Sequence, residues 1–437
     1  MPSNKPSPFI GNLLDWPVNR RDRTFEVYVA EPGVYDPPSH AEIFTAAINV
    51  FVGQEPALID PYETGQKIST PLRFDLITFP EAFLPTGELI TTLRFFSQLE
   101  SPGCVHVGLR PHSKDPNHLL PKPELSTLLD DLNQVPGIVE RDLDKFSQWL
   151  ANQQDHMRFN VGCLFTVDAN RQLRVCLHPK LVPSSVEVSS LEEQHMSAGN
   201  LLTVVRLRPT DKLRKTIVIQ PLLCSDALHL DTDSGEDRPL EAVNKDAGCF
   251  GDDPPDHIDI VSVATHTRQI EQSISKGSFY RTWHQEFKNS FVRAASDDAL
   301  ARHHFSTFVL SNFRTLSTNE PGGLSGAFIP VPRGTGNFRE YVSISSWGRL
   351  QGSKGDNMWS SPDQDHQVAA NWETRGYIAS LNPFGEKADA VARLFGFTVA
   401  RLPRDRSLWR GSSAALTKCT LQWGESRGSP PLLAFVS

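Results

Sequence analysis

The sequence predicts a mixed α/β fold built from stacked layers. From about residue 25 to residue 384, strand-like segments alternate with segments whose apolar residues recur at helical spacing, such as 89–99 and 142–152. Residues 259–265 are almost continuously apolar, which is typical of a strand whose sheet is covered on both faces. The 33 prolines also favour many short strands over a helical bundle.

The remaining elements are expected from local patterns. A hairpin is expected over residues 159–177, because two runs of alternating character flank the turn 168–171. A short helix is expected at 299–305. Further strands are expected at 75–79, 307–312, 322–330, 376–381, 397–402 and 432–436.

The predicted organisation is one main domain with additions. Residues 1–24 are expected to be an N-terminal lead-in, 25–384 the main domain and 385–437 a C-terminal extension that packs on it. Within the domain, 111–145 is rich in proline, leucine and charge, and 231–256 is acidic and rich in glycine and proline. Both are expected to be surface insertions, which loops tolerate at low cost, and both are candidate lids over a pocket.

Composition restricts the class of protein. Of 437 residues, 39% are hydrophobic and 22% charged, as in an ordinary soluble globular protein. The net charge of −8 argues against a nucleic-acid partner. We expect no membrane partner, because no apolar run approaches the ~20 residues that span a bilayer. Six scattered cysteines and the lack of a signal-peptide profile favour reduced thiols in the cytoplasm.

Three segments far apart in the chain each place a reactive side chain at the end of an apolar run. They carry Glu81 after Phe-Pro, Lys180 after His-Pro, and Cys224 after Leu-Leu. Such positions deliver side chains to the rim of a sheet. A carboxylate can take the proton of a thiol, and an ammonium can stabilise the oxyanion that forms when the thiolate attacks a carbon–nitrogen bond. The three residue types therefore predict catalysis through a covalent acyl intermediate.

These motifs resemble those of the nitrilase superfamily of carbon–nitrogen hydrolases, in which the order is also Glu, Lys, Cys. The run Lys-Leu-Val-Pro from Lys180 leads to Glu187, as in the nitrilase branch, where a second glutamate follows the lysine. The resemblance extends over roughly residues 25–384. It implies a four-layer αββα sandwich, Glu187 as a substrate-binding and lysine-positioning residue, and a homo-oligomer, with a dimer expected.

The chain departs from that pattern beside the cysteine. Ser225 replaces the usual aromatic residue, whereas Asp226 keeps an acidic residue at the next position. Both are candidate substrate-binding residues, and the loss of the aromatic wall leaves substrate identity open. We expect an amide substrate in preference to a nitrile, and neither metal nor cofactor, because thiolate chemistry needs neither.

Alternative interpretations remain. Taken singly, Cys224 fits a small core residue, Glu81 a charge at a helix N-terminus and Lys180 a solvated turn residue. An acyltransferase would use the same thioester, resolved by an amine in place of water. A nitrilase-fold binding or assembly module with little catalysis is a third class. His257, His266, His303 and His304 show no metal-ligand spacing and are expected to be ordinary surface or core residues.

Overall fold

The computed structural model describes most of the first three quarters of the chain and short stretches beyond. The expected strand at 432–436 and residues 231–238 of the second expected insertion lie outside the described residues. The described residues are 9–19, 24–33, 35–51, 57–59, 66–68, 74–99, 102–112, 118–184, 187–188, 195–212, 215–228, 239–245, 247–267, 270–271, 281–282, 287, 290–291, 293–295, 297–304, 306–313, 315–317, 320–321, 325–332, 372–378, 390–400 and 416–422.

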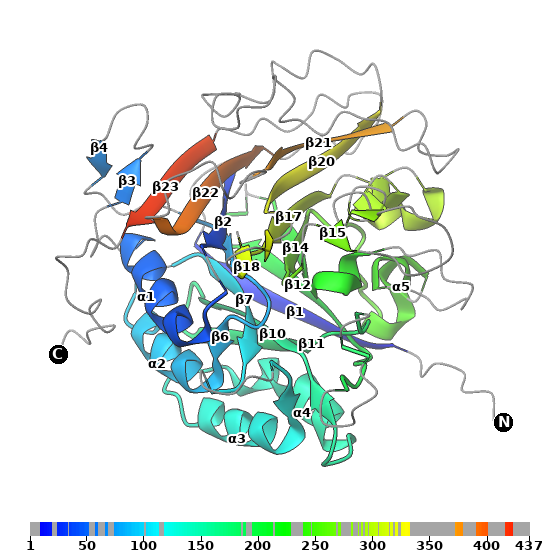
Figure 1. Ribbon diagram of the computed structural model, residues 1–437. Helices are drawn as coiled ribbons and strands as arrows, with labels where there is room; N and C mark the ends of the chain where they lie inside the picture. The colour runs from blue at the N-terminus through cyan, green and yellow to red at the C-terminus, as the bar shows by residue number, and fades with distance from the viewer. Residues whose placement is uncertain are drawn as a thin grey trace.

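The fold is mixed α/β, as the sequence predicted, and contains two large mixed sheets (Figure 1). The first sheet has seven strands. β1 pairs in parallel with β12, and β14 lies in parallel between β13 and β17. Its order is β1 (Ile10–Val18), β12 (Leu201–Pro209), β13 (Ile217–Leu223), β14 (Ile260–Ala264), β17 (Thr307–Ser311), β20 (Gly326–Pro332) and β21 (Trp372–Ile378).

The second sheet has ten strands and contains the predicted hairpin, β10 with β11. β5 lies in parallel between β2 and β7. Its order is β11 (Leu173–Pro179), β10 (Val161–Val167), β7 (Cys104–Arg110), β5 (Leu76–Thr78), β2 (Thr24–Pro32), β22 (Ala390–Ala400), β23 (Leu416–Gln422), β3 (Ala57–Ile59) and β4 (Gln66–Ile68), and β6 (Leu84–Pro85) pairs with β7.

Helices pack on the outer faces. α1 (His40–Phe51), α2 (Thr86–Phe96), α3 (Lys122–Asn133) and α4 (Asp144–Ala151) share an apolar cluster with the ten-stranded sheet (Figure 1). α5 (Pro239–Lys245) and the 3₁₀ helix η6 (Asp298–His303) share another cluster with the seven-stranded sheet. Shorter elements are η1 (Pro37–Ser39), β8 (Leu120–Pro121), η2 (Glu140–Asp142), β9 (Arg158–Phe159), η4 (Cys224–Ala227), η5 (Ala247–Phe250), β15 (Ile270–Glu271), β16 (Arg281–Thr282), β18 (Thr315–Ser317) and β19 (Glu320–Pro321).

The two large sheets pack against each other through a third apolar cluster, to which Trp16, Val27 and Val205 belong. A polar chain also crosses this interface. The hydroxyl of Ser262 lies 2.7 Å from both Thr78 Oγ1 and His106 Nδ1, and His106 Nε2 lies 3.1 Å from Nε2 of His178. Partnered polar groups of this kind lower the cost of burial. They also link the strands that precede Glu81 and Lys180.

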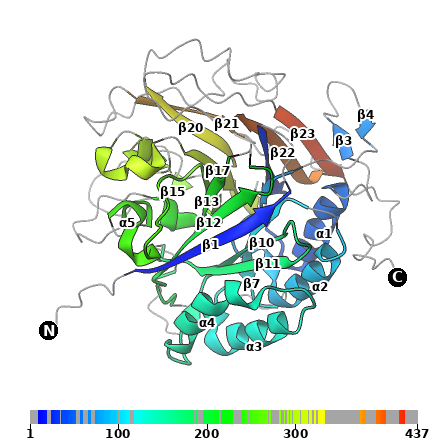
Figure 2. The same ribbon diagram turned by 180° about the vertical axis from the view of Figure 1, so that it is seen from behind.

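The structure differs from the expected organisation in three segments. Residues 10–18 of the expected lead-in form β1, paired with β12 along nine residues (Figure 2). Residues 122–133 of the first expected insertion form α3, which buries its four leucines at helical spacing. Residues 390–400 of the expected extension form β22, which lies between β2 and β23. Pairing partners so distant in sequence leave no local signal.

Candidate functional site

The three predicted residues follow strands of both large sheets. Glu81 lies in the turn after β5, Lys180 directly follows β11, and Cys224 follows β13 as the first residue of η4. All three side chains are buried, with exposed fractions of 3%, 1% and 2% respectively. The site therefore lies where strand ends of the two sheets meet.

Four side chains form a closed ring of hydrogen bonds at this place. Lys180 Nζ donates to Glu81 Oε1 at 2.8 Å and to Glu187 Oε2 at 2.6 Å. Asn160 Nδ2 donates to the same Glu81 Oε1 at 2.7 Å and to Glu187 Oε1 at 2.8 Å. His118 Nε2 lies 3.5 Å from Glu187 Oε1. The structure thus brings together the predicted lysine and both predicted glutamates, and adds an asparagine.

The electrostatics of the two glutamates differ. Burial raises the pKa of Glu81, and Lys180 only partly offsets that effect. Burial also acts to raise the pKa of Glu187, but Lys180 and His118 outweigh it and hold that pKa well below its usual value. Burial opposes the charge of Lys180, yet the two carboxylates raise its pKa well above the usual value. Glu187 is therefore a permanent counter-ion, whereas Glu81 is the better proton acceptor.

Cys224 occupies an uncommon backbone conformation. Its φ of 41° lies in the left-handed region, which non-glycine residues seldom adopt and which clusters at functional turns. Burial and the Glu81 carboxylate raise the pKa of its thiol well above the usual value, and Lys180 opposes them. The resting side chain is consequently a neutral thiol that needs a base. The backbone N–H of His266 contacts the sulfur.

Ser225 and Asp226 bond to the lysine segment. Ser225 Oγ donates to the carbonyl of Val182 at 2.5 Å. Asp226 Oδ1 accepts the backbone N–H groups of Leu181 at 2.9 Å and of Val182 at 2.8 Å. These bonds hold the cysteine turn against the segment that follows Lys180. They give both residues a positioning role, and the prediction that they also bind substrate stays a prediction.

Partly exposed aromatic side chains lie beside the buried ring. Tyr35, His118 and His266 each retain intermediate exposure. The rings of Tyr35 and His266 stack at 4.2 Å, and Phe313 contacts both at 5.0 and 5.3 Å. Arg110, at the end of β7, donates to the Tyr35 hydroxyl at 3.1 Å. These groups are candidates for the wall of a substrate pocket.

Sequence reasoning missed two of these contributions. His266 was expected to be an ordinary histidine, but it follows Thr265, whose carbonyl accepts the Glu81 N–H at 3.3 Å, and its own N–H faces the cysteine sulfur. Asn160 lies within the expected hairpin at 159–177. The available signal was its place just before β10, beside the strand that leads to Lys180. No pattern of charges or spacing identified the carboxylates it would contact.

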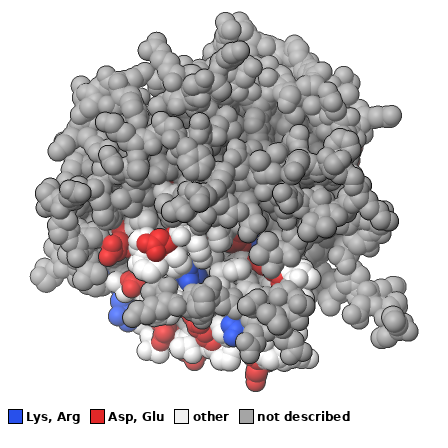
Figure 3. Space-filling model, in the orientation of Figure 1, with Lys and Arg blue, Asp and Glu red and all other residues white. Residues whose placement is uncertain are grey.

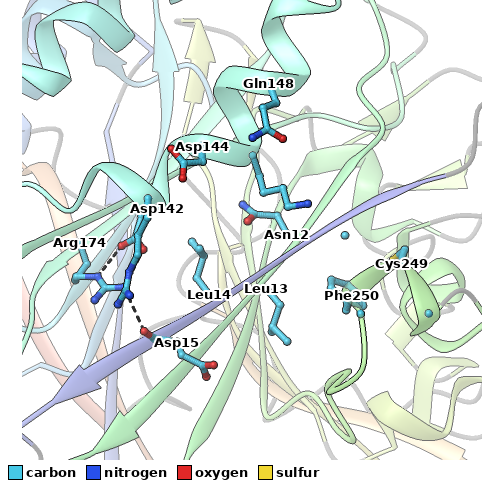
Figure 4. Close-up of a pocket in the computed structure, with 15 residues that line it drawn as sticks. Asn12, Leu13, Leu14, Asp15, Asp142, Asp144, Gln148, Arg174, Cys249 and Phe250 are labelled. Carbon is cyan, nitrogen blue, oxygen red and sulfur yellow. Dashed lines mark hydrogen bonds and ion pairs between the residues drawn. The ribbon is translucent and has the colours of Figure 1, made fainter.

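A separate cavity of about 660 Å³ lies between β1, α4 and η5 (Figure 4). Its lining includes Arg174, whose guanidinium forms a bidentate pair with Asp142 at 2.6 and 2.8 Å and donates to the Asp15 carbonyl at 3.2 Å. Arg174 also contacts Asp168 at 3.3 Å. Glu81, Lys180 and Cys224 do not line this cavity. Arg174 therefore joins β11 to η2 through its ion pair with Asp142 and to β1 through its hydrogen bond to the Asp15 carbonyl.

The charge distribution on the described surface shows no separate patch of one sign in Figure 3. On the face seen in Figure 3, the coloured acidic and basic side chains are interspersed among uncharged ones. Among the described residues, no three His, Cys, Asp or Glu side chains are grouped to hold a metal, and no helix is both long and apolar enough to cross a membrane. None of the described cysteines, Cys104, Cys163, Cys176, Cys224 and Cys249, forms a disulfide bond.

Neither a scan against protein-family models nor a search of curated proteins found a match.

Proposed function

We propose that this protein hydrolyses non-peptide carbon–nitrogen bonds, amides in preference to nitriles, through thiolate attack by Cys224. The observation that carries this proposal is the contact of Lys180 with both Glu81 and Glu187 in a buried ring beside the strained cysteine turn. A stabilising role alone would be a weak reason for burying two carboxylates and an ammonium, because desolvation opposes all three charges. Such clusters are typical of functional sites.

The proposed reaction begins with proton transfer. Glu81 takes the proton from the Cys224 thiol as the sulfur attacks the carbonyl carbon of the amide. The Lys180 ammonium stabilises the developing oxyanion, a contribution typically of about 3–4 kcal/mol. The tetrahedral intermediate then expels ammonia or an amine, which receives the proton from Glu81. Water, activated by the same carboxylate, hydrolyses the thioester and restores the thiol.

The directions of the pKa shifts support these roles. A raised pKa makes Glu81 a stronger base toward the thiol and a competent acid toward the departing amine. Amide hydrolysis needs Glu81 both as a base and as an acid, because the amine or ammonia that leaves must be protonated. Glu187 stays ionised and keeps Lys180 charged. Two carboxylates whose environments move their pKa values apart commonly have different roles, one in acid–base chemistry and one in holding the site together.

The same proposal extends to the architecture and the assembly. We infer that the two sheets and their outer helices form the four-layer αββα sandwich of the nitrilase superfamily, since the facing sheets share one apolar cluster and each outer face has its own. The resemblance further supports a homo-oligomer. The five described cysteines form no disulfide bond, which supports the expected cytoplasmic location.

The decisive experiment is ammonia release from a panel of small primary amides and nitriles. Cys224→Ala should reduce release to background, and Lys180→Met should do nearly the same. Cys249→Ala is the matched control, because Cys249 is half-buried at the separate cavity and should leave turnover unchanged. Undiminished turnover in Cys224→Ala would refute the nucleophile. A wild type inactive on the whole panel would favour the binding-module alternative.

A further inference from the structure

Asn160 is the member of the hydrogen-bonded ring to which no role has yet been given. It precedes β10, is fully buried, and uses both amide hydrogens on carboxylates, one on Glu81 and one on Glu187. Bonds from an amide to ionised carboxylates are charge-assisted and stronger than those between neutral groups. Its backbone carbonyl accepts the Lys180 N–H at 2.7 Å, so the same residue also fixes the chain at the lysine.

The other end of this amide has an unfavourable environment. Asn160 Oδ1 is buried, and no hydrogen-bond donor reaches it in the described part of the chain. An unsatisfied buried acceptor costs free energy, so such an arrangement requires a compensating reason. The two carboxylate contacts of Nδ2 are that reason, because an apolar side chain of similar size would remove the cost but would also remove both donors.

The two carboxylate oxygens of Glu81 differ in the hydrogen bonds that they accept from the ring. Both hydrogen bonds that the described residues donate to this carboxylate, from Lys180 and from Asn160, reach Oε1. An oxygen that already accepts two short hydrogen bonds is a poor site for a proton, because protonation there breaks one of those hydrogen bonds. We propose that Asn160 is a positioning residue that saturates Oε1 of Glu81 and so assigns Oε2 as the oxygen that exchanges protons with Cys224 and the leaving amine.

This inference rests on the proposed function only for the identity of the groups that exchange protons with Glu81 Oε2. Its effect on Glu81 itself can be measured without any substrate. The charged or titratable groups that face Glu81 are Lys180, Glu187, His118, Cys224 and Tyr35. Donation from Asn160 favours the ionised form of Glu81 in addition to all of these. Removal of the donor should therefore let Glu81 keep its proton to a higher pH.

The test is a pH titration of the full chain by infrared spectroscopy. The carboxylic-acid carbonyl band of Glu81 is identified by its loss in Glu81→Gln. In Asn160→Ala this band should persist to a pH higher by about one unit, the effect of one lost hydrogen bond to a carboxylate. Asn160→Ser, which can donate to one carboxylate at a time, should shift it less and serves if the alanine variant does not fold.

Two comparison variants make the result specific. Glu187→Gln removes a negative neighbour and should shift the titration of Glu81 to lower pH, opposite to Asn160→Ala. Asn12→Ala removes another buried asparagine, in β1, and should leave the titration unchanged. An unshifted band in a folded Asn160 variant would overturn the inference. Absence of amide turnover would count against the proposed function alone, since the titration needs no substrate.

Discussion

The carboxylate of Asp226 accepts the backbone N–H of Leu181 at 2.9 Å across 45 residues of sequence. The same oxygen accepts the N–H of Val182 at 2.8 Å. Asp226 thus joins the turn that carries Cys224 to the segment that begins at Lys180. Together with the bond from Ser225 Oγ to the Val182 carbonyl, this side chain fixes the position of the cysteine turn relative to the lysine segment.

Replacement of Asp226 should destabilise the protein. Asp226→Ala leaves the N–H groups of Leu181 and Val182 without their acceptor, at a cost of about 1–3 kcal/mol for each buried group. Asp226→Asn keeps one carbonyl oxygen in place and should lose much less. Urea unfolding of the two variants measures the difference. Equal stabilities would mean that these backbone bonds contribute little.

Asp226 should also make stability depend on pH. Burial raises its pKa to about 7 in the folded protein, above the ordinary value of 3.8. The folded state then binds the extra proton between these values, so this contribution to the free energy of unfolding decreases as pH rises from about 4 to about 7. Relative to Asp226→Asn, the wild type should lose stability between about pH 4 and about pH 7. A constant difference would contradict the shift.

Buried histidines should act in the opposite direction. Burial lowers the pKa of His303 to about 3, and its ring already bonds Gln220 at 2.8 Å and Asn244 at 2.9 Å. Only the unfolded chain takes up this proton between pH 6.5 and 3, so stability should fall on acidification through that window. His303→Gln should reduce the slope of the free energy of unfolding against pH by the equivalent of up to one bound proton. Replacement of the exposed His156 is the control in the same urea titration.

The approach of β7 to the Glu81 turn leaves no space for a side chain. A methyl group on Gly108 would lie 2.4 Å from the Cα atom of Glu81 and 2.5 Å from the backbone nitrogen of Ala82. Gly108→Ala should therefore displace Glu81, reduce turnover and cost roughly 1–3 kcal/mol. Gly87→Ala, in α2 with no atom within 4 Å, should be neutral or stabilising by less than about 1 kcal/mol. Calorimetry and ammonia release report the two effects, and equal behaviour of the variants would contradict the prediction.

The cysteines should differ in reactivity. Burial raises the pKa of Cys176 and Cys163, and we expect both to react only after global unfolding. Cys249 is half-buried and should be alkylated in the native state independently of Glu81. Cys224 should be alkylated in the native state with the help of Glu81, so that Glu81→Gln slows it by about 10²-fold or more. Peptide mass mapping measures all sites together. A Cys224 no faster than Cys176 would indicate a closed or inactive site.

Local patterns were sufficient for much of the fold. The helical stripe at 89–99 became α2, the alternating runs became the β10–β11 hairpin, and the apolar run 259–265 became β14. Each of these elements is determined by a period or a turn contained within it. The three motif residues were also visible in the sequence, because an apolar run that ends in a turn marks a strand end.

Only the tertiary structure decided how these parts meet. β1 and β22 pair with strands far away in the chain, and α3 is a helix whose leucines are buried by partners the sequence does not name. Asn160 and His266 entered the site for the same reason, since hydrogen bonds depend on distance in space. The sequence by itself determined which reactive side chains end strands. Packing of the two sheets determined which of them share a ring, because burial and contact belong to the assembled fold.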